Sequence, residues 1–434
     1  LLYWNYIMIS FYLLTLICQL FFYLDFSSAF DTVDHSLLLN VLEISFGTNG
    51  SCLSWFNSYL SNRSFHVSIE SSCSSETSLT YGVPQGSILG PLLFILYTSE
   101  LPKIISSFSL DSQIYADDSY IYSSFSDSSL DSVVNKIKSC LHTIISWSSS
   151  MCLKLNPDKF ELIYFTKSSK SSLLPSLALP PPSSLSLVPS PSIRSLGFIL
   201  DAHLSLSPQI LSVTKSCYFH LRRIKQLLPF LDDPTLQLLI SSLVLSRIDY
   251  CNSLYFGLPD TTLSPLTKAF NSAARLVARS PKFSSISPFL ILLHWLPLRY
   301  RVMFKICVIM FKIHNSISPI YLNNLIKKPL KLGLRSSSFN RSFRFSVKHS
   351  FAKRSFSYSG PFLWNSLPSS LTATKSLMVF RRGLKAYLFK KFMAERFCSP
   401  RKRRYIKFKW LIDWLIETYY LNVVYRLKWQ NVFG

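Results

Sequence analysis

Two adjacent acids, Asp117 and Asp118, lie between two runs of apolar and aromatic residues, Ile114-Tyr115 and Tyr120-Ile121-Tyr122. The flanks predict two β-strands, and Ala116-Asp117-Asp118 predicts the tight turn that joins them. Such a hairpin holds two carboxylates at a fixed tip, which suits a hard divalent cation because this kind of ion takes oxygen ligands. An ordinary solvated turn is the simpler interpretation of this stretch alone, since Asp is common in turns. The neighbouring motifs decide between the two.

The composition indicates a folded chain whose two halves differ in charge. At 434 residues, of which 48% are hydrophobic, the chain has room for two or three domains and is not mostly disordered. Residues 1–160 hold 6 Lys/Arg and 13 Asp/Glu, a net charge of −7. Of the totals of 46 and 22, this leaves 40 basic and 9 acidic residues for 161–434, a net charge of +31. The asymmetry favours a metal site joined to a surface that binds a polyanion.

The nine cysteines are dispersed, with no CxxC pair and no Cys/His cluster at zinc spacing. This usage predicts buried free thiols in a reducing compartment and excludes a disulfide framework.

The first 24 residues carry no charge and are long enough to span a bilayer. They lack the basic segment and the small-residue cleavage site of a signal peptide. The end of this stretch, Phe21-Phe22-Tyr23-Leu24, is more typical of a buried strand that runs into Asp25. We therefore keep a membrane anchor over 1–24 as a disfavoured alternative, because it would place Asp25 at the bilayer edge, away from the other acids.

Hydrophobic periodicity predicts a mixed helix and strand architecture in the first half of the chain. Helices are expected over 36–44, 52–60, 92–97 and 130–148, strands over 153–165 and 193–200, and a β-pair over 64–80. The Ser/Pro-rich stretch 168–192 predicts a loop. From about residue 209 the pattern is helical and basic, and residues 401–434 form a basic aromatic tail.

Three stretches occur in a fixed order within about a hundred residues: Leu24-Asp25-Phe26-Ser27-Ser28-Ala29-Phe30-Asp31, Gly82-Val83-Pro84-Gln85-Gly86-Ser87, and Tyr115-Ala116-Asp117-Asp118. In combination they resemble the A, B and C motifs of the reverse-transcriptase palm, most closely that of non-LTR (LINE-like) retrotransposons. Further along, His294–Arg301 and Gly360–Pro368 resemble the C-terminal region of the CR1/L2/jockey group of these elements.

The resemblance implies an α+β fold, a right-hand polymerase palm with an antiparallel sheet and helices on one face. The palm is expected over 21–204, a helical thumb over 205–282, an element-specific region over 283–400 and the tail over 401–434, with 1–20 unassigned. The family's fingers should precede the palm, and the 24 uncharged residues before Asp25 are too few for them. We therefore expect a chain truncated at its N-terminus, without an endonuclease domain.

The carboxylates agree with the resemblance on physical grounds. Asp25 ends a buried strand and Asp117 lies at a hairpin tip, so the two could hold two Mg²⁺ ions (Mn²⁺ being an alternative) that bridge an attacking 3′-hydroxyl and a leaving pyrophosphate. Asp118 is expected at the same magnesium site, as a helper that shapes the turn. Residues 153–161 resemble the next motif of the family, in which a lysine protonates the pyrophosphate. Lys159 is the candidate, with a plain surface lysine as the alternative.

Other site residues follow from the resemblance alone. Phe30 lies where the family has an aromatic wall against the ribose 2′-hydroxyl, although a plain core Phe is the alternative. Phe26, Gln85 and Gly86 are expected at the template and incoming nucleotide. Leu196 and Gly197, within 193–201, resemble the hairpin that grips the primer. Asp31 and Asp34 are expected to be helix N-terminal charges and not metal ligands.

The function that these residues imply is RNA-directed DNA polymerase, a nucleotidyltransferase that acts on an RNA template, a DNA primer and deoxynucleoside triphosphates in the nucleus or cytoplasm. The alternative is a catalytically inactive remnant that binds nucleic acid through its basic half. The two differ in one observable, because a remnant binds in a salt-sensitive way without synthesis.

Overall fold

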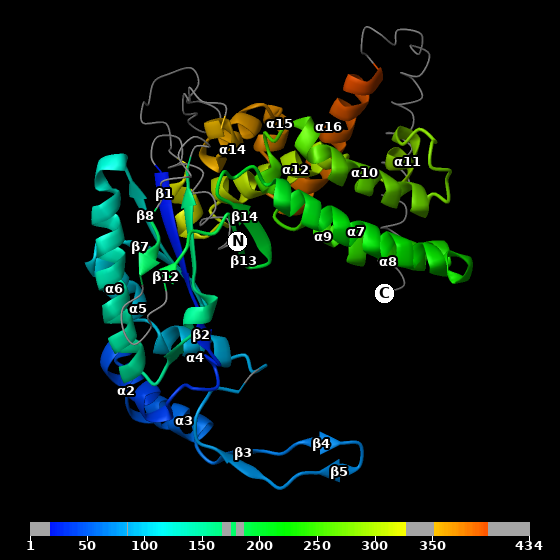
Figure 1. Ribbon diagram of the computed structural model, residues 1–434. Coiled ribbons are helices and arrows are strands. Elements are labelled where there is room, and N and C mark those ends of the chain that lie inside the picture. Colours follow the sequence, from blue (N-terminus) through cyan, green and yellow to red (C-terminus); the bar gives the residue numbers. More distant parts are fainter. Residues whose placement is uncertain (1–17, 85, 167–174, 179–185, 327–350, 398–434) are drawn as a thin grey trace. The chain divides into compact units, whose positions relative to one another are not determined.

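The computed structural model describes residues 18–84, 86–166, 175–178, 186–326 and 351–397 (Figure 1). The chain forms two compact units. Unit 1 comprises Leu1–Ser212 and Val347–Ser355, and unit 2 comprises Val213–Ser346 and Phe356–Gly434. The expected mixture of helix and sheet is confirmed. The names palm and thumb, and the boundaries drawn at 204 and 282, stay predictions. The stretches 1–17 and 401–434 and residue Gln85 lie outside the described residues.

The centre of unit 1 is a four-stranded antiparallel sheet in the order β10-β1-β8-β7. Its strands are β1 (Cys18–Leu24), β7 (Asp111–Tyr115), β8 (Asp118–Phe125) and β10 (Glu161–Phe165). The strand expected over Phe21–Leu24 is confirmed, and β1 is apolar on both faces because both are covered. Phe22 and Leu24 are fully buried on one face. On the other, Phe21 packs on Tyr122 and Phe165, at ring centroid distances of 5.1 and 4.9 Å.

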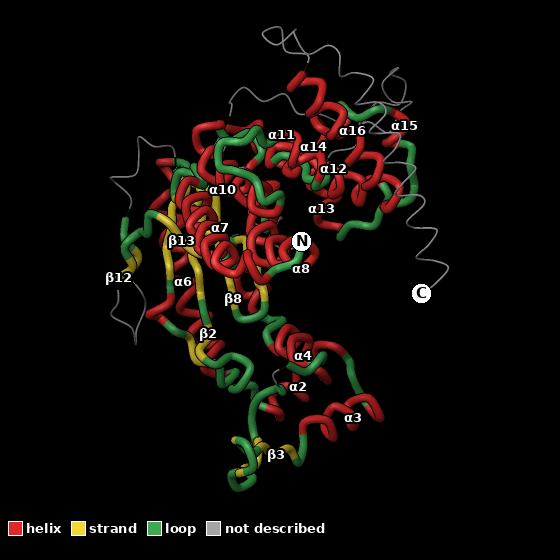
Figure 2. The backbone as a smooth tube through the Cα atoms, turned by 90° about the vertical axis from the view of Figure 1, so that its right-hand side faces the viewer, coloured by secondary structure: helices red, strands yellow, loops and turns green. Residues whose placement is uncertain are grey.

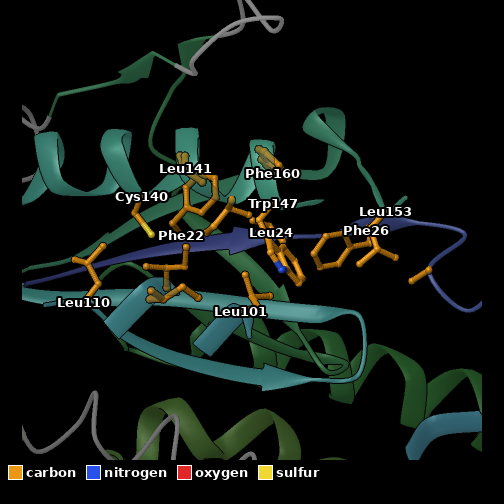
Figure 3. Close-up of a cluster of buried hydrophobic side chains, with 14 of the residues drawn as sticks. Phe22, Leu24, Phe26, Leu101, Leu110, Cys140, Leu141, Trp147, Leu153 and Phe160 are labelled. Atoms are coloured by element: carbon orange, nitrogen blue, oxygen red, sulfur yellow. The ribbon is translucent and has the colours of Figure 1, made fainter. Parts of the chain in front are cut away.

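Helices of unit 1 close the core over one face of the sheet. They are α2 (His35–Phe46), α3 (Gly50–Leu60), α4 (Gly90–Tyr97), α5 (Leu101–Ser107) and α6 (Leu130–Ser150), with short 3₁₀ helices at Asp127–Ser129, Pro157–Lys159 and Phe351–Arg354. Val133, Ile137 and Leu141 of α6 follow a helical period and are buried. Figure 3 shows the cluster, in which Trp147 of α6 lies beside Leu24 and Phe26. Four of these five α-helices match predicted ranges, and α5 was not predicted.

Short strand pairs extend from this core. They are β2 (Phe26–Ser27) with β9 (Lys154–Leu155), β3 (Arg63–Phe65) with β6 (Thr77–Leu79), β4 (Ser68–Ile69) with β5 (Ser72–Cys73), β11 (Leu177–Ala178) with β12 (Ser186–Leu187), and β13 (Ser192–Ser195) with β14 (Phe198–Asp201). The β-pair predicted over 64–80 is confirmed, and within unit 1 it projects away from the central sheet (Figure 1).

Two predicted strands are wrong in detail. The strand expected over 153–165 is broken into β9, a 3₁₀ turn and β10, because Pro157 lacks the N–H that a ladder needs. The strand expected over 193–200 is the hairpin β13–β14. Its turn residues, Leu196 and Gly197, both have positive φ, 45° and 80°, which is the pattern of a type I′ turn.

Unit 2 is helical, as the pattern from about residue 209 predicted (Figure 2). After α7 (Ser207–Leu227), which begins in unit 1, come α8 (Asp233–Ile240), α9 (Ser246–Asp249), α10 (Asp260–Val277), α11 (Ser287–Leu292), α12 (Leu298–His314), α13 (Ile320–Asn324), α14 (Phe356–Asn365), α15 (Ser369–Thr372) and α16 (Leu377–Phe397). Shorter turns lie at Leu228–Phe230, Ser241–Leu245 and Asn252–Tyr255. Trp364 is 1% exposed and stacks on His314 at 4.6 Å, so it is a core residue.

Two predictions made from composition, on a membrane anchor and on the cysteines, can be compared with the described residues. No helix among the described residues is long and apolar enough to cross a membrane, and the part of the uncharged N-terminal stretch that is described, Cys18–Leu24, is β1. Seven cysteines in the described part of the chain are free thiols, as predicted: Cys52, Cys73, Cys140, Cys152, Cys217, Cys251 and Cys307. Their expected burial holds for Cys140, Cys217 and Cys307 but is wrong for three others, which are exposed: Cys52, Cys73 and Cys152.

Candidate active site

Asp25 is the first residue after β1, and its side chain is buried. In the β1–β8 ladder Leu24 pairs with Ser119, so one further step of the register sets Asp25 against Asp118. The backbone carbonyl of Asp25 accepts a hydrogen bond from the N–H of Asn156 at 3.0 Å. The strand end, and with it the carboxylate, is therefore fixed from both sides.

The hairpin β7–β8 carries the other two acids. Tyr115 pairs with Asp118, so the turn consists of Ala116 and Asp117, and Asp118 is already the first residue of β8. Ala116 has a φ of 54°. This left-handed conformation is strained for a residue with a Cβ, and such strain concentrates at functional sites. The predicted hairpin is confirmed, with its turn one residue shorter than expected.

Tyr23 joins the buried Asp25 to the half-buried Asp118, and the sequence analysis did not predict this role. Its hydroxyl is within hydrogen-bonding distance of Asp25 Oδ1, at 3.2 Å, and of Asp118 Oδ1. Burial, together with the charges of the two carboxylates, raises the pKa of Tyr23, so the phenol stays protonated as a donor. The signal available in the sequence was its position two residues before Asp25, since alternate residues of a strand share a face.

Lys159 closes the site from the 3₁₀ turn Pro157–Lys159, which precedes β10. Its ammonium group lies 2.9 Å from Asp25 Oδ2, and its side chain is 60% exposed whereas that of Asp25 is 6% exposed. The hydrogen bond and charge of Asp25 raise the pKa of Lys159, which keeps this lysine protonated. The exposed ammonium group of Lys159, a proton donor that solvent or substrate can reach, is therefore paired with the buried carboxylate of Asp25.

The three carboxylates lie close enough to influence one another. Burial raises the pKa of Asp118, and the charges of Asp117 and Asp25 raise it further, while the Tyr23 hydrogen bond and Lys159 act in the opposite direction. Carboxylate oxygens are the ligands that a hard divalent cation takes. In the described part of the chain, however, no group of three or more His, Cys, Asp or Glu side chains converges as a metal site. This agrees with the contacts of Asp25, whose two carboxylate oxygens are bound by Lys159 and Tyr23.

The predicted nucleotide residues have different surroundings. Phe30 is half-buried and packs on Phe94 at a centroid distance of 4.7 Å, so one part of its ring is in the core and another is accessible. Phe26 is 3% exposed and belongs to the hydrophobic core, so its position does not support the expected nucleotide contact. Gly86 is exposed with a φ of 82° and open space around its α-carbon. Gln85 lies outside the described residues.

The loop that carries Gly86 is attached to the segment after Asp25. Gly82 donates its N–H to the carbonyl of Val33 at 2.7 Å, and Val83 donates to Phe30 at 2.8 Å. Asp34 caps α2 by accepting from the N–H of Leu37 at 2.9 Å, as predicted for a helix N-terminal charge. These contacts bring the first and second motifs together.

The hairpin predicted to grip a primer is attached to the strand that carries Asp118. The hydroxyl of Ser195, in β13, donates to the hydroxyl of Tyr120 at 2.6 Å, and Tyr120 lies two residues after Asp118. Leu196 and Gly197 form the tip next to this contact. The structure therefore brings the third motif and this hairpin together.

Family comparison agrees with this geometry. Residues 15–200 match the profile of the family described as reverse transcriptase (RNA-dependent DNA polymerase). The matched range contains the acids Asp25, Asp117 and Asp118, together with Lys159 and the hairpin tip.

Relatives of this reverse-transcriptase segment come from Drosophila melanogaster. The chain is 29% identical over 211 residues to the probable RNA-directed DNA polymerase from transposon BS, covering 48% of this chain and 22% of that protein. It is 29% identical over 196 residues to the probable RNA-directed DNA polymerase from transposon X-element, covering 44% of this chain and 20% of that protein. It is 26% identical over 199 residues to the RNA-directed DNA polymerase from mobile element jockey, covering 45% of this chain and 21% of that protein. The match spans about a fifth of each relative.

Among solved structures, telomerase from Candida albicans, in complex with a TWJ fragment of telomeric RNA, matches with 13% identity. The match covers 64% of this chain and 49% of that chain at a TM-score of 0.28. A TM-score this low carries no argument about fold or function.

Proposed function

We propose that the chain is an RNA-directed DNA polymerase of a LINE-like element, which joins a deoxynucleotide to a primer 3′-hydroxyl on an RNA template. The observation that carries the proposal is the meeting of Asp25, Asp118 and Lys159 at one strand end, within the segment that matches reverse transcriptases. The names of the Drosophila relatives support the same reaction.

In this proposal Asp25 and Asp117 hold Mg²⁺, and Asp118 supports the turn between them. When bound, the metal supplies positive charge to the attacking oxygen and to the leaving pyrophosphate. Asp25 would exchange its contact with Lys159 for the cation. This exchange would leave the exposed Lys159 ammonium beside the triphosphate.

The protein's own groups then act on the proton and on position. Lys159 donates a proton to the pyrophosphate oxygen as the bond to the α-phosphorus breaks. Tyr23 holds Asp118 and Asp25 in place through its hydroxyl. The accessible part of the Phe30 ring would limit the space at the sugar 2′ position, and the tip at Leu196 and Gly197 would contact the primer.

The test is extension of a labelled DNA primer on an RNA template with Mg²⁺, with EDTA and template-free reactions as controls. The proposal expects extension that depends on both metal and template. The alternative, an inactive nucleic-acid-binding protein, expects no extension together with binding that weakens steeply as salt rises. No observation on the described residues favours this alternative.

A further inference from the structure

A cavity of about 490 Å³ lies in unit 2, whereas the acids described above belong to unit 1. Phe304 of α12 lines one part of it. The remaining lining comes from α16: Leu377, Met378, Arg381, Arg382 and Lys385. Its volume is in the range of pockets that hold small ligands, about 300–1,000 Å³.

The periodicity of α16 separates this lining from the core. Phe380, Leu384 and Leu388 recur every four residues and are buried, 0–2% exposed, in unit 2. Leu377, Arg381 and Lys385 recur at the same spacing on a neighbouring face, where they line the cavity. The buried face of α16 therefore fixes the helix in the core of unit 2, and the neighbouring face directs the three cations into the cavity.

These cations have no acidic partner among the described residues. The described part of unit 2 contains five acids, and each one is engaged elsewhere. Four contact other side chains or caps: Asp232 the Thr235 N–H, Asp233 Arg279, Asp249 Arg301, and Asp260 Arg299. Glu395 accepts from the Tyr300 hydroxyl at 2.6 Å. Three like charges within five residues repel one another, so an anion would stabilise this face.

The rest of the lining is apolar. Phe304 is half-buried, and Met378 is 59% exposed, so both present apolar surface beside the cations. An apolar, partly aromatic wall next to three cations suits a ligand that has both a flat apolar part and an anion. Burial and the charge of Arg301 lower the pKa of Lys385, in agreement with an uncompensated cation at this place.

We infer that this cavity binds one nucleotide unit of a single-stranded nucleic acid, with its phosphate at Arg381, Arg382 and Lys385 and its base against Phe304. Arginine forks match phosphate oxygens, and base stacking on aromatic rings is a sequence-tolerant way to hold single strands. The net charge of +31 over residues 161–434 favours a nucleic acid over an acidic peptide, which would leave the aromatic wall unused. The inference does not depend on polymerase activity.

The test uses the full chain and a short fluorescein-labelled single-stranded RNA. Arg381→Gln/Arg382→Gln is compared with Lys375→Gln/Lys390→Gln, which removes the same charge from exposed positions outside the cavity. We expect the arginine pair to weaken binding about tenfold and to lower the salt slope by about 0.7, the value for one phosphate contact on a single strand. The lysine pair should change affinity by about twofold or less.

Phe304→Leu gives a second, uncharged variant, and thermal unfolding checks that each variant is folded. Loss of one stacked base should weaken binding by about tenfold. A photoreactive uridine in the RNA should crosslink to peptides that contain Phe304 or Met378. Equal affinities of the arginine and lysine pairs would overturn the inference. So would arginine-dependent binding of phosphatidylserine vesicles or a polyglutamate peptide combined with unchanged RNA binding.

Discussion

The ammonium group of Lys159 lies 2.9 Å from the carboxylate of Asp25, although 134 residues separate the two in the chain. The pairing of β1 with β10 accounts for this contact. Tyr23 pairs with Glu161 at the start of β10, and Lys159 ends the 3₁₀ turn Pro157–Lys159 just before that strand. The site therefore depends on the pairing of β1 with two strands, β8, which begins at Asp118, and β10, which follows Lys159.

Replacing Lys159 with Gln should lower the rate of primer extension on the order of 10²-fold, because a positioned general acid contributes about 10²–10⁴-fold. Single-turnover extension measures the rate. Lys154→Gln, an exposed lysine on β9, is the matched control and should leave the rate within about twofold. Equal rates for the two variants would contradict the role given to Lys159.

Replacing Tyr23 with Phe should lower kcat about tenfold and leave KM for the nucleotide nearly unchanged. The variant removes the single hydroxyl proton that Asp25 and Asp118 share, and a hydrogen bond to a charged group contributes about 1.5–3 kcal/mol. Tyr164→Phe on β10 removes a hydroxyl that donates to the carbonyl of Pro175 at 3.0 Å instead, and it serves as the control. A change in KM alone would count against a role in holding the acids.

Two glycines test the loop that joins the first and second motifs. Gly86→Ala should cost about 1 kcal/mol of stability, because φ is 82° and nothing lies within 4 Å of the added Cβ. Gly82→Ala should cost more, since its φ is 88° and the Cβ would lie 2.9 Å from the carbonyl oxygen of Asp31. Urea unfolding of unit 1 compares the two. If both cost the same, the close approach to Asp31 is not present in solution.

The cap of α8 gives a pH-dependent prediction in unit 2. Hydrogen bonds from Thr235 lower the pKa of Asp232 below its ordinary 3.8, so its folded-state pKa is below its unfolded value. Its contribution to stability is present above the ordinary pKa and is lost as the pH falls through the folded-state pKa. Asp232→Ala should therefore lower Tm at pH 7, and the difference from wild type should shrink below about pH 4. Asp232→Asn, which keeps an acceptor, should lose less, and a pH-independent difference would contradict the cap.

Local features of the site could be predicted from the sequence. The turn at Ala116 and Asp117 is bounded by aromatic and apolar strand residues on both sides, so a few neighbouring residues determine it. The end of β1 before Asp25 is equally local, because an apolar run stops at a charge. The cap at Asp34 follows from residue type and position before a helix.

What could not be predicted depends on pairing between distant segments. The hydroxyl of Tyr23 meets Asp118 only because β1 pairs with β8, and nothing near Tyr23 in the chain indicates this partner. Phe26 was expected at a nucleotide, yet packing against α6 places it in the core. In contrast, the hairpin β13–β14 could have been predicted, because a glycine inside a strand pattern, here Gly197, indicates a turn.

The most direct test of the proposed site is single-turnover primer extension on an RNA template with Mg²⁺, comparing Asp117→Asn with Asp111→Asn. Both variants neutralise one acid of the same hairpin, Asp117 at its turn and Asp111 at the exposed start of β7. The proposal predicts that Asp111→Asn extends the primer at the wild-type rate, and that Asp117→Asn loses extension while RNA binding is kept. Extension by Asp117→Asn at the wild-type rate would contradict it.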